Sequence, residues 1–200
     1  MKGIILLNGE PYRGKIDAED AFVICCDGAL KSANVPIDVI AGDFDSLGYV
    51  PEGGVVYPSE KDFTDGEIAL EMLLAKGIRD IIIYGGGGGR DDHFFGNLQL
   101  LVAAHRRGAF AMLRTNYTDI YCAEGEICWR DKRGKTLSLA PVGESAHIME
   151  SEGLKYPLCD LTLAAGSCRG ISNVIEKDAA RIVCDDGVLF VFEVTEEAKW

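Results

Sequence analysis

Short apolar runs alternate with amphipathic stretches through the first half of the chain. The runs have the length of buried strands, and several end at glycine or aspartate, which are common turn residues. The strands predicted here are residues 4–7, 21–26, 37–41, 55–57, 81–84 and 110–113. Strands that alternate with helical segments favour a mostly parallel sheet that is covered on both faces.

Two stretches of this half have the pattern of an amphipathic helix. In residues 64–76, apolar side chains recur between charged ones, and the stretch ends at Lys76-Gly77 as helices commonly do. A second helix is predicted over residues 92–107, where Gly108 follows two basic residues. Its expected apolar side comprises Phe94, Phe95, Leu98, Leu101 and Val102. A short helix is also predicted over residues 29–33.

The pattern changes at residues 114–119, and beyond them no stretch has the length and periodicity of an amphipathic helix. The predicted strands are residues 120–123, 126–129, 136–139, 146–149, 161–164, 173–176, 180–184 and 188–194. Between the last two, Asp186-Gly187 predicts a hairpin turn. We therefore predict an α/β domain over residues 1–116 and an all-β sandwich domain over residues 117–200.

Composition and charge narrow the possible functions. The chain has 200 residues, of which 48% are hydrophobic, so it can bury a substantial core. Its net charge of -12 argues against binding a nucleic-acid backbone, which requires a basic face. The seven cysteines form no C-x-x-C pair and are odd in number, which indicates reduced thiols. Because the first apolar run is too short for a signal peptide and no stretch could span a membrane, we expect a cytoplasmic protein with no membrane partner.

Two acidic residues follow the strand predicted over residues 37–41. The stretch Ala41 to Leu47 reads AGDFDSL. If the backbone stays extended past Gly42, Asp43 and Asp45 point to the same side. Their repulsion would be relieved by a divalent cation, and oxygen ligands suit Mg²⁺ that is shared with substrate phosphates. A simple turn after a strand is the alternative, since Gly, Asp and Ser are ordinary turn residues.

A polar cluster also precedes the helix predicted over residues 64–76. In open α/β sheets, ligands bind at the carboxyl ends of the strands, where this cluster is expected to lie. Thr64 and Glu67 fit a capping box, and acidic side chains in a first turn favour the helix dipole. Capping leaves Lys61, Asp62 and Asp65 unexplained, which makes them candidate site residues.

A glycine run follows another predicted strand. Residues 84–97 read YGGGGGRDDHFFGN. Since glycine loses the most backbone entropy on folding, five in succession indicate a backbone that approaches a ligand and offers its N–H groups to phosphate oxygens. Arg90 adds donors that match a phosphate, His93 and Asn97 share a helix face, and Asp92 lies at the helix start. A flexible loop before a solvated helix is the alternative; the run is neither a Walker A loop nor a Rossmann fingerprint.

Together these motifs resemble those of the thiamine pyrophosphokinase family. The resemblance rests on GDFDS, on the K-D-x-T-D segment, on G-G-R-x-D-H followed by Asn97, and on GLKYPL (residues 153–158) and GISN (residues 170–173). It implies an α/β domain that binds ATP, a β-sandwich that binds thiamine, and a homodimer with active sites at the subunit interface. In the implied reaction the β,γ-diphosphoryl group of ATP moves to the hydroxyethyl oxygen of thiamine, which gives thiamine diphosphate and AMP.

The resemblance and the residue chemistry together assign the roles. Transfer of this kind relies on positioning and charge neutralisation. We expect Mg²⁺ on Asp43, Asp45 and Asp65, with Asp27 close by, and Asp92 or Asp65 orienting or deprotonating the attacking hydroxyl. His93 is expected to be structural or hydrogen-bonding, because a helix start disfavours its protonated form. The expected ATP-binding residues are Asp27, Lys61, Asp62, Gly87, Gly88, Gly89, Arg90, His93 and Asn97.

In the second domain, Tyr156 is expected to stack on thiamine, and Ser172 and Asn173 to hydrogen-bond its aminopyrimidine edge. Ordinary turn chemistry is the alternative for all three residues. The chain departs from the family at Tyr156, where tryptophan is usual, and at residues 27–31, where a glycine-rich turn is usual. Because tyrosine offers a smaller stacking face than tryptophan, we expect Tyr156 to change the affinity or selectivity for thiamine more than the type of reaction.

Two other functions are consistent with part of these motifs. A pyrophosphokinase that acts on another alcohol, such as a hydroxymethylpterin, can share the N-terminal motifs, but GLKYPL and GISN argue against it. A non-catalytic sensor of thiamine or nucleotide would retain a pocket. A protein that only binds its ligand does not need four acidic residues at the site, so the presence of Asp43, Asp45, Asp65 and Asp92 together argues against a sensor.

Overall fold

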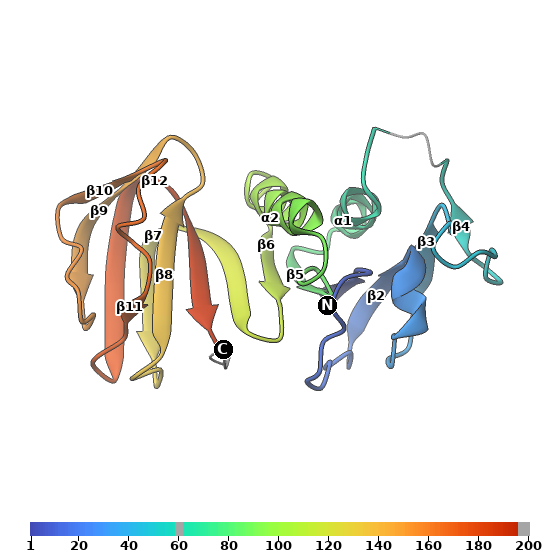
Figure 1. Ribbon diagram of the computed structural model, residues 1–200, viewed down its shortest axis with the longest axis horizontal. Helices are drawn as coiled ribbons and strands as arrows, with labels where there is room; N and C mark the ends of the chain where they lie inside the picture. The colour runs from blue at the N-terminus through green and yellow to red at the C-terminus, as the bar shows by residue number, and fades with distance from the viewer. Residues whose placement is uncertain (59–61, 196–200) are drawn as a thin grey trace. The chain divides into compact units, whose positions relative to one another are not determined.

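The computed structural model describes residues 1–58 and 62–195, and strands predominate over helices in it (Figure 1). The chain divides into two compact units, one that ends at Asn116 and one that begins at Tyr117. No helix in the described part of the chain is long and apolar enough to cross a membrane.

The first unit contains a parallel sheet in the order β6-β5-β1-β2-β3-β4. Its elements are β1 (Lys2–Leu6), β2 (Ala21–Cys26), the 3₁₀ helix η1 (Asp27–Lys31), β3 (Val39–Gly42), β4 (Val55–Val56), α1 (Asp65–Ala75), β5 (Asp80–Tyr84), α2 (Asp91–His105) and β6 (Phe110–Arg114). Because the strands are parallel, their carboxyl ends meet at one edge of the sheet.

Alternate side chains of the central strands fill the core on the two faces of this sheet. On one face α1 packs against β1, β2 and β3, and α2 packs against β6. On the other face Ile4 and Leu6 join a buried cluster that the loop after β1 and the segment around η1 cover. The segment over residues 29–33, for which a helix was predicted, is shifted and forms the 3₁₀ helix instead.

The start of α1 is set by a capping box, as predicted. Thr64 Oγ1 accepts a hydrogen bond from the Glu67 N–H (3.2 Å), and Glu67 Oε2 accepts one from the Thr64 N–H (2.8 Å). This pair of bonds satisfies two N–H groups that a helix start otherwise leaves without partners. It places Asp65 at the first position of the helix, on the carboxyl edge of the sheet.

The buried face of α2 differs from the prediction at Phe95, whose side chain is 64% exposed. Asn97, Leu100, Leu101 and Ala104 follow the spacing of a single helix face, and the last three are buried. Phe95 lies two residues before Asn97, which is about 200° around the helix. Its ring therefore points away from the sheet, and the prediction was wrong for this residue.

The second unit consists of antiparallel strands. They are β7 (Thr118–Arg130), β8 (Thr136–Pro141), β9 (Ser145–Glu152), β10 (Leu161–Ala164), β11 (Asn173–Val174) and β12 (Ala179–Val194). Strand β12 pairs with β7 along nearly its whole length. On its other side its first half pairs with β9 and its second half with β8, and β11 pairs with β8.

Asp186-Gly187 does not form the predicted hairpin, because β12 continues through it. A hairpin would pair the two halves of this segment with each other, yet both halves pair with β7, and the register shifts between Cys184 and Leu189. At Gly187, φ is +80°, and an added Cβ would lie 2.6 Å from the Ser145 carbonyl oxygen. The dipeptide therefore accommodates an irregularity within a long strand rather than a chain reversal.

Candidate active site

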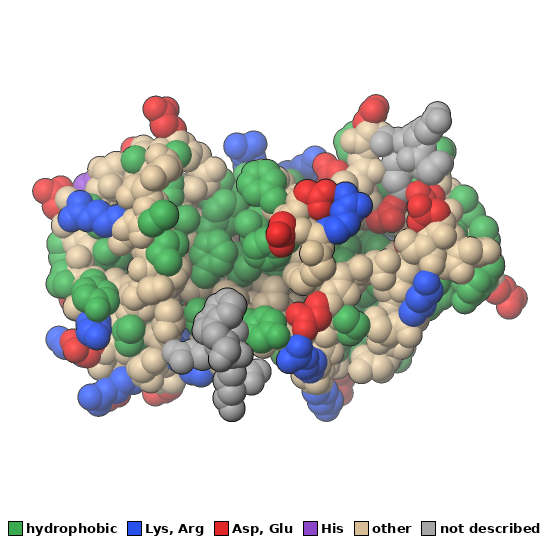
Figure 2. Space-filling view, in the orientation of Figure 1, with side chains coloured by type: hydrophobic (Ala, Val, Ile, Leu, Met, Phe, Trp, Pro, Cys, Tyr) green, Lys and Arg blue, Asp and Glu red, His purple; other side chains and the backbone are tan. Residues whose placement is uncertain are grey.

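Three predicted acidic residues meet at the carboxyl edge of the parallel sheet. Asp27 follows β2, Asp43 follows β3, and Asp65 begins α1. One carboxylate oxygen from each lies within 4.8 Å of the others. Figure 2 shows acidic side chains gathered on the face of the first unit near α1 and β3. Oxygen ligands in this number and spacing are able to hold a hard divalent cation.

Asp27 is the most unusual member of this cluster. Its side chain is 5% exposed, and its Oδ1 accepts no hydrogen bond from the described part of the chain. Its φ of +37° is rare for a residue with a side chain, and Gly42 is required beside it, because a Cβ there would lie 2.9 Å from Asp27 Cβ. A buried carboxylate oxygen without a partner costs free energy, which a bound cation would offset.

Asp45 lies outside the cluster, because the backbone does not stay extended past Gly42. Strand β3 ends there, and Phe44 adopts a φ of +62° with its ring buried in the core. The exposed Asp45 carboxylate accepts a hydrogen bond from Ser46 Oγ (3.1 Å), while its N–H donates to Asp43 Oδ1 (3.3 Å). The extended backbone that would point Asp43 and Asp45 to the same side is therefore not present.

The glycine run packs against the loop that follows β1. The Gly9 N–H donates to Gly85 O (2.7 Å), and the Glu10 N–H donates to Gly87 O (2.7 Å). A Cβ on Gly85 would lie 2.2 Å from the Leu7 carbonyl oxygen. Part of the run is thus required by close packing within the protein. This requirement is separate from the phosphate binding for which the run was predicted.

The remaining glycines of the run differ in the space around them. A Cβ on Gly88 would lie 2.6 Å from Glu10 Cβ, whereas one on Gly89 would meet nothing within 4 Å. Asn97 supports the run from α2, since its Nδ2 donates to Gly86 O (2.8 Å). Asn97 thus uses its Nδ2 donor within the protein, its ATP-binding role stays a prediction, and Gly89 has open space beside it.

Arg90 and Asp92 form a two-pronged ion pair at the start of α2. Arg90 Nε donates to Asp92 Oδ1 (3.1 Å), and Nη2 donates to Oδ2 (2.5 Å). The hydrogen bond from Arg90 lowers the pKa of Asp92 to about 2. Asp62 and His93 are exposed. Lys61, the other predicted phosphate ligand, lies outside the described residues.

The three predicted thiamine-binding residues lie close together in the second unit. Tyr156 N–H donates to Asn173 Oδ1 (3.1 Å), and Asn173 Nδ2 donates to Tyr156 O (2.7 Å). Ser172 is exposed with a φ of +59°, and its N–H donates to Ser138 Oγ (2.9 Å). Lys155 Nζ lies 5.4 Å from the centre of the exposed Tyr156 ring. This arrangement leaves Tyr156 and Ser172 accessible and engages Asn173 internally.

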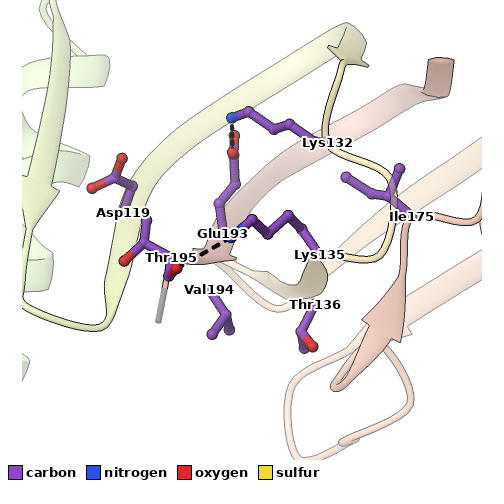
Figure 3. A pocket seen from close by; sticks show the side chains of 8 residues that line it. All are labelled: Asp119, Lys132, Lys135, Thr136, Ile175, Glu193, Val194 and Thr195. Atoms are coloured by element: carbon purple, nitrogen blue, oxygen red, sulfur yellow. Dashed lines mark hydrogen bonds and ion pairs between the residues drawn. The ribbon is translucent and has the colours of Figure 1, made fainter. Parts of the chain in front are cut away.

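A small hollow elsewhere in the second unit is built around Glu193 (Figure 3). Glu193 Oε1 accepts hydrogen bonds from Tyr121 OH (2.7 Å) and Trp129 Nε1 (3.1 Å), and Oε2 pairs with Lys132. The lining residues are Asp119, Lys132, Lys135, Thr136, Ile175, Glu193, Val194 and Thr195. No predicted thiamine-binding residue is among them, and the satisfied Glu193 fits a rigid structural network.

The loop after β1 borders the candidate site, although none of its residues is among the predicted site residues. A Cβ on Gly28 would lie 2.3 Å from Asn8 Nδ2, so this loop reaches the turn that begins at Asp27. Its polar residues Asn8 and Glu10 come soon after the strand predicted over residues 4–7, at the carboxyl end where open α/β sheets bind ligands.

Comparison with known proteins places both halves of the chain. A family model described as the thiamin pyrophosphokinase catalytic domain matches residues 15–113, and one described as the thiamin pyrophosphokinase vitamin B1 binding domain matches residues 125–189. The chain is 29% identical over 177 residues to a thiamine pyrophosphokinase of Bacillus subtilis, covering 84% of this chain and 82% of that protein.

Solved structures agree with these matches. The crystal structure of thiamine pyrophosphokinase from Bacillus subtilis superposes with a TM-score of 0.84 at 27% identity, covering 98% of this chain and 100% of that one. The structure of thiamin pyrophosphokinase from Geobacillus thermodenitrificans gives a TM-score of 0.82 at 26% identity, covering 99% of each chain.

Proposed function

The chain belongs to the thiamin pyrophosphokinase family of enzymes, and we propose that it transfers the β,γ-diphosphoryl group of ATP to the hydroxyethyl oxygen of thiamine with the aid of Mg²⁺. The observation that carries this proposal is the cluster of Asp27, Asp43 and Asp65 at the carboxyl edge of the sheet, the edge at which the glycine run follows β5. The first unit would bind ATP and the second, as a β-sandwich, would bind thiamine.

The donor set fits a divalent cation. Asp27, Asp43 and Asp65 would hold it, because the buried Asp27 Oδ1 has no hydrogen-bond partner in the described part of the chain and three carboxylates this close repel one another. When bound, such an ion neutralises negative charge on phosphate oxygens. Asp45 lies outside the cluster, two residues after Asp43, and would contact the ion or the phosphates from there.

The residues around the cluster would position the phosphates. The N–H groups near Gly89 and the guanidinium of Arg90 would donate to phosphate oxygens, and Lys61 would add a positive charge. Asp92 is a poor general base, because its pKa is near 2 and Arg90 holds both of its oxygens. We therefore assign Asp92 to orienting Arg90, and Asp65 to orienting the attacking hydroxyl.

Tyr156 and Ser172 would contact thiamine in the second unit. The exposed Tyr156 ring offers an aromatic face to a cationic thiazolium or to the pyrimidine. Asn173 would act through Tyr156, whose main chain it binds. From the family resemblance we further expect a homodimer with active sites at the subunit interface; a monomeric mass in solution with full activity would contradict this.

The proposal is tested by incubating the protein with ATP, Mg²⁺ and thiamine and separating the products. We expect AMP to form in step with thiamine diphosphate, and both to disappear with chelator. ADP instead of AMP would indicate transfer of a single phosphoryl group. If no product depends on thiamine, the assay is repeated with a hydroxymethylpterin as the acceptor. If that alcohol gives no product either, the result would favour a non-catalytic sensor.

Variants separate the roles in this assay. Asp43→Asn and Asp45→Asn are expected to abolish turnover while the protein remains folded. Asp178→Asn is a matched control, since Asp178 is exposed in the second unit and its contact with Arg133 spans 4.0 Å. Full activity of Asp45→Asn would remove Asp45 from the proposed site.

A further inference from the structure

The pairing of β1 with β5 continues past the ends of both strands into the proposed ATP site. Leu7 N–H donates to Tyr84 O (2.9 Å), and the bonds from Gly9 to Gly85 and from Glu10 to Gly87 extend the ladder. The loop after β1 is therefore held along the glycine run. Its residues lie on the carboxyl edge of the sheet, where ligands of open α/β folds bind.

Arg13 is fixed in this loop by its main chain and by its side chain. Its N–H donates to Asn116 Oδ1 (2.8 Å), and Asn116 Nδ2 donates to Pro11 O (3.0 Å). Its guanidinium donates from Nη2 to Glu10 Oε1 (2.5 Å). Two separate anchors thus define where the charge of Arg13 lies.

The Glu10 carboxylate links Arg13 to the glycine run. Glu10 Oε2 lies 3.3 Å from the position that a Cβ on Gly88 would occupy, and Oε1 accepts the bond from Arg13. The guanidinium of Arg13 is therefore separated from the backbone of Gly88 by a single carboxylate. A guanidinium has five N–H donors, so it can keep its bond to Glu10 and still bind a second anion.

The charge of the protein makes another cation useful at this edge. The chain carries a net charge of -12, and three carboxylates already meet at this edge of the sheet. Of the nearby cations, Arg90 directs two donors at Asp92, and Lys31 Nζ donates to Ser46 O (2.5 Å). A triphosphate that approaches this edge requires positive charge to balance its own.

We propose that Arg13 is a phosphate-binding residue of the nucleotide site, linked to the glycine run through Glu10 and anchored by Asn116. The inference rests on the proposed ATP-binding function of this edge. An ordinary surface ion pair between Glu10 and Arg13 would contribute little to stability and nothing to nucleotide affinity. The two alternatives therefore differ in a measurable way.

The test compares Arg13→Ala, Arg13→Lys and Glu10→Gln with the control Arg106→Ala. Arg106 is also an exposed arginine, but it caps the carboxyl end of α2, about 24 Å along the helix from Arg90. Binding of a non-hydrolysable ATP analogue, inorganic tripolyphosphate and adenosine is measured with Mg²⁺ present. Thermal unfolding of each variant checks that it folds.

We expect Arg13→Ala to weaken binding of the ATP analogue and of tripolyphosphate about tenfold, and to raise the KM for ATP with little change in kcat. Arg13→Lys retains part of the affinity because it keeps the charge, and Glu10→Gln loses less than Arg13→Ala because it removes only the side-chain anchor. Adenosine binding, the KM for thiamine and all properties of Arg106→Ala remain unchanged.

Unchanged tripolyphosphate binding by Arg13→Ala would overturn the inference, and so would a loss confined to adenosine. If Arg13→Ala does not fold, Arg13→Lys replaces it, and unchanged tripolyphosphate binding by Arg13→Lys would overturn the inference. A wild-type protein that binds neither the ATP analogue nor tripolyphosphate would instead overturn the proposed function on which the inference rests.

Discussion

The side-chain amide of Asn173 binds the main chain of Tyr156 in both directions. Asn173 Oδ1 accepts hydrogen bonds from the N–H groups of Tyr156 (3.1 Å) and Val174 (2.8 Å), and its Nδ2 donates to Tyr156 O (2.7 Å). Asn173 is 3% exposed, whereas Tyr156 is 54% exposed. The buried amide therefore holds in place a loop whose aromatic ring faces outward.

Replacing Asn173 should affect both stability and thiamine binding. Asn173→Ala leaves buried main-chain groups without partners, so we expect its free energy of unfolding to fall by about 2 kcal/mol and its KM for thiamine to rise. Tyr156→Ala should raise the same KM with a smaller loss of stability, because its ring is exposed. Denaturant unfolding and steady-state kinetics measure both effects. Asn173→Asp has nearly the same shape but replaces the Nδ2 donor with an acceptor that faces Tyr156 O. If this variant had wild-type stability and a wild-type KM for thiamine, the role of Asn173 in holding the Tyr156 main chain would be contradicted.

Asp27→Asn should change stability and activity in opposite directions. Removing one charge from the cluster relieves repulsion, so without divalent cations the variant should be more stable than wild type by about 1 kcal/mol or more. It should lose the stabilisation that Mg²⁺ gives the wild type, and its turnover should fall at least ~100-fold. Thermal unfolding with chelator and with Mg²⁺ measures this. Asp45→Asn, outside the cluster, should keep more of the Mg²⁺ response; an equal loss in both variants would contradict the assigned ligand set.

Asp92 should act on the reaction only through Arg90. Asp92→Asn removes the ion pair that orients the Arg90 guanidinium, so we expect a raised KM for ATP with most of kcat retained. In a double-mutant cycle, Asp92→Asn should add nothing in an Arg90→Ala background, so the effects of the two single substitutions should not be additive. The neighbouring exposed Asp91 provides the control variant Asp91→Asn. If adding Asp92→Asn to Arg90→Ala lowered kcat further, Asp92 would have to contact the reactants directly.

His147 should make the second unit more stable in mild acid. Its Nδ1 lies 2.6 Å from Asp185 Oδ1 and its Nε2 lies 3.3 Å from Asp160 Oδ1, and the hydrogen bond with Asp185 is the main reason that its pKa is raised. A raised pKa in the folded state stabilises the protein below the unfolded pKa of about 6.5, and this contribution is lost as pH rises through the folded value.

The Tm difference between wild type and His147→Gln measures that contribution. We expect wild type to exceed the variant near pH 5.5 and the gap to close near pH 9, since other titrating groups cancel in the difference. A gap that widens as pH rises would contradict the sign of the shift.

The sequence alone was sufficient for features that depend on neighbouring residues. The apolar runs identify the strands of the first unit to within about two residues, and the Thr64 and Glu67 capping box sets the start of α1. Both follow from short-range physics, namely burial along a strand and hydrogen bonding within one helical turn. The motifs that resemble the family are likewise local, and the two matching family models confirm that membership.

Tertiary structure alone decided which side chains meet. Burial of Phe44 turns the chain after Gly42 and separates Asp45 from the cluster that Asp27 completes. Pairing with β7 on both sides of Asp186-Gly187 makes one strand where the dipeptide predicts a hairpin. The loop after β1 requires glycines in the run beside it and brings Glu10, the ion-pair partner of Arg13, close to Gly88. Each outcome depends on a partner distant in sequence, and neither periodicity nor turn chemistry records which partner a segment packs against.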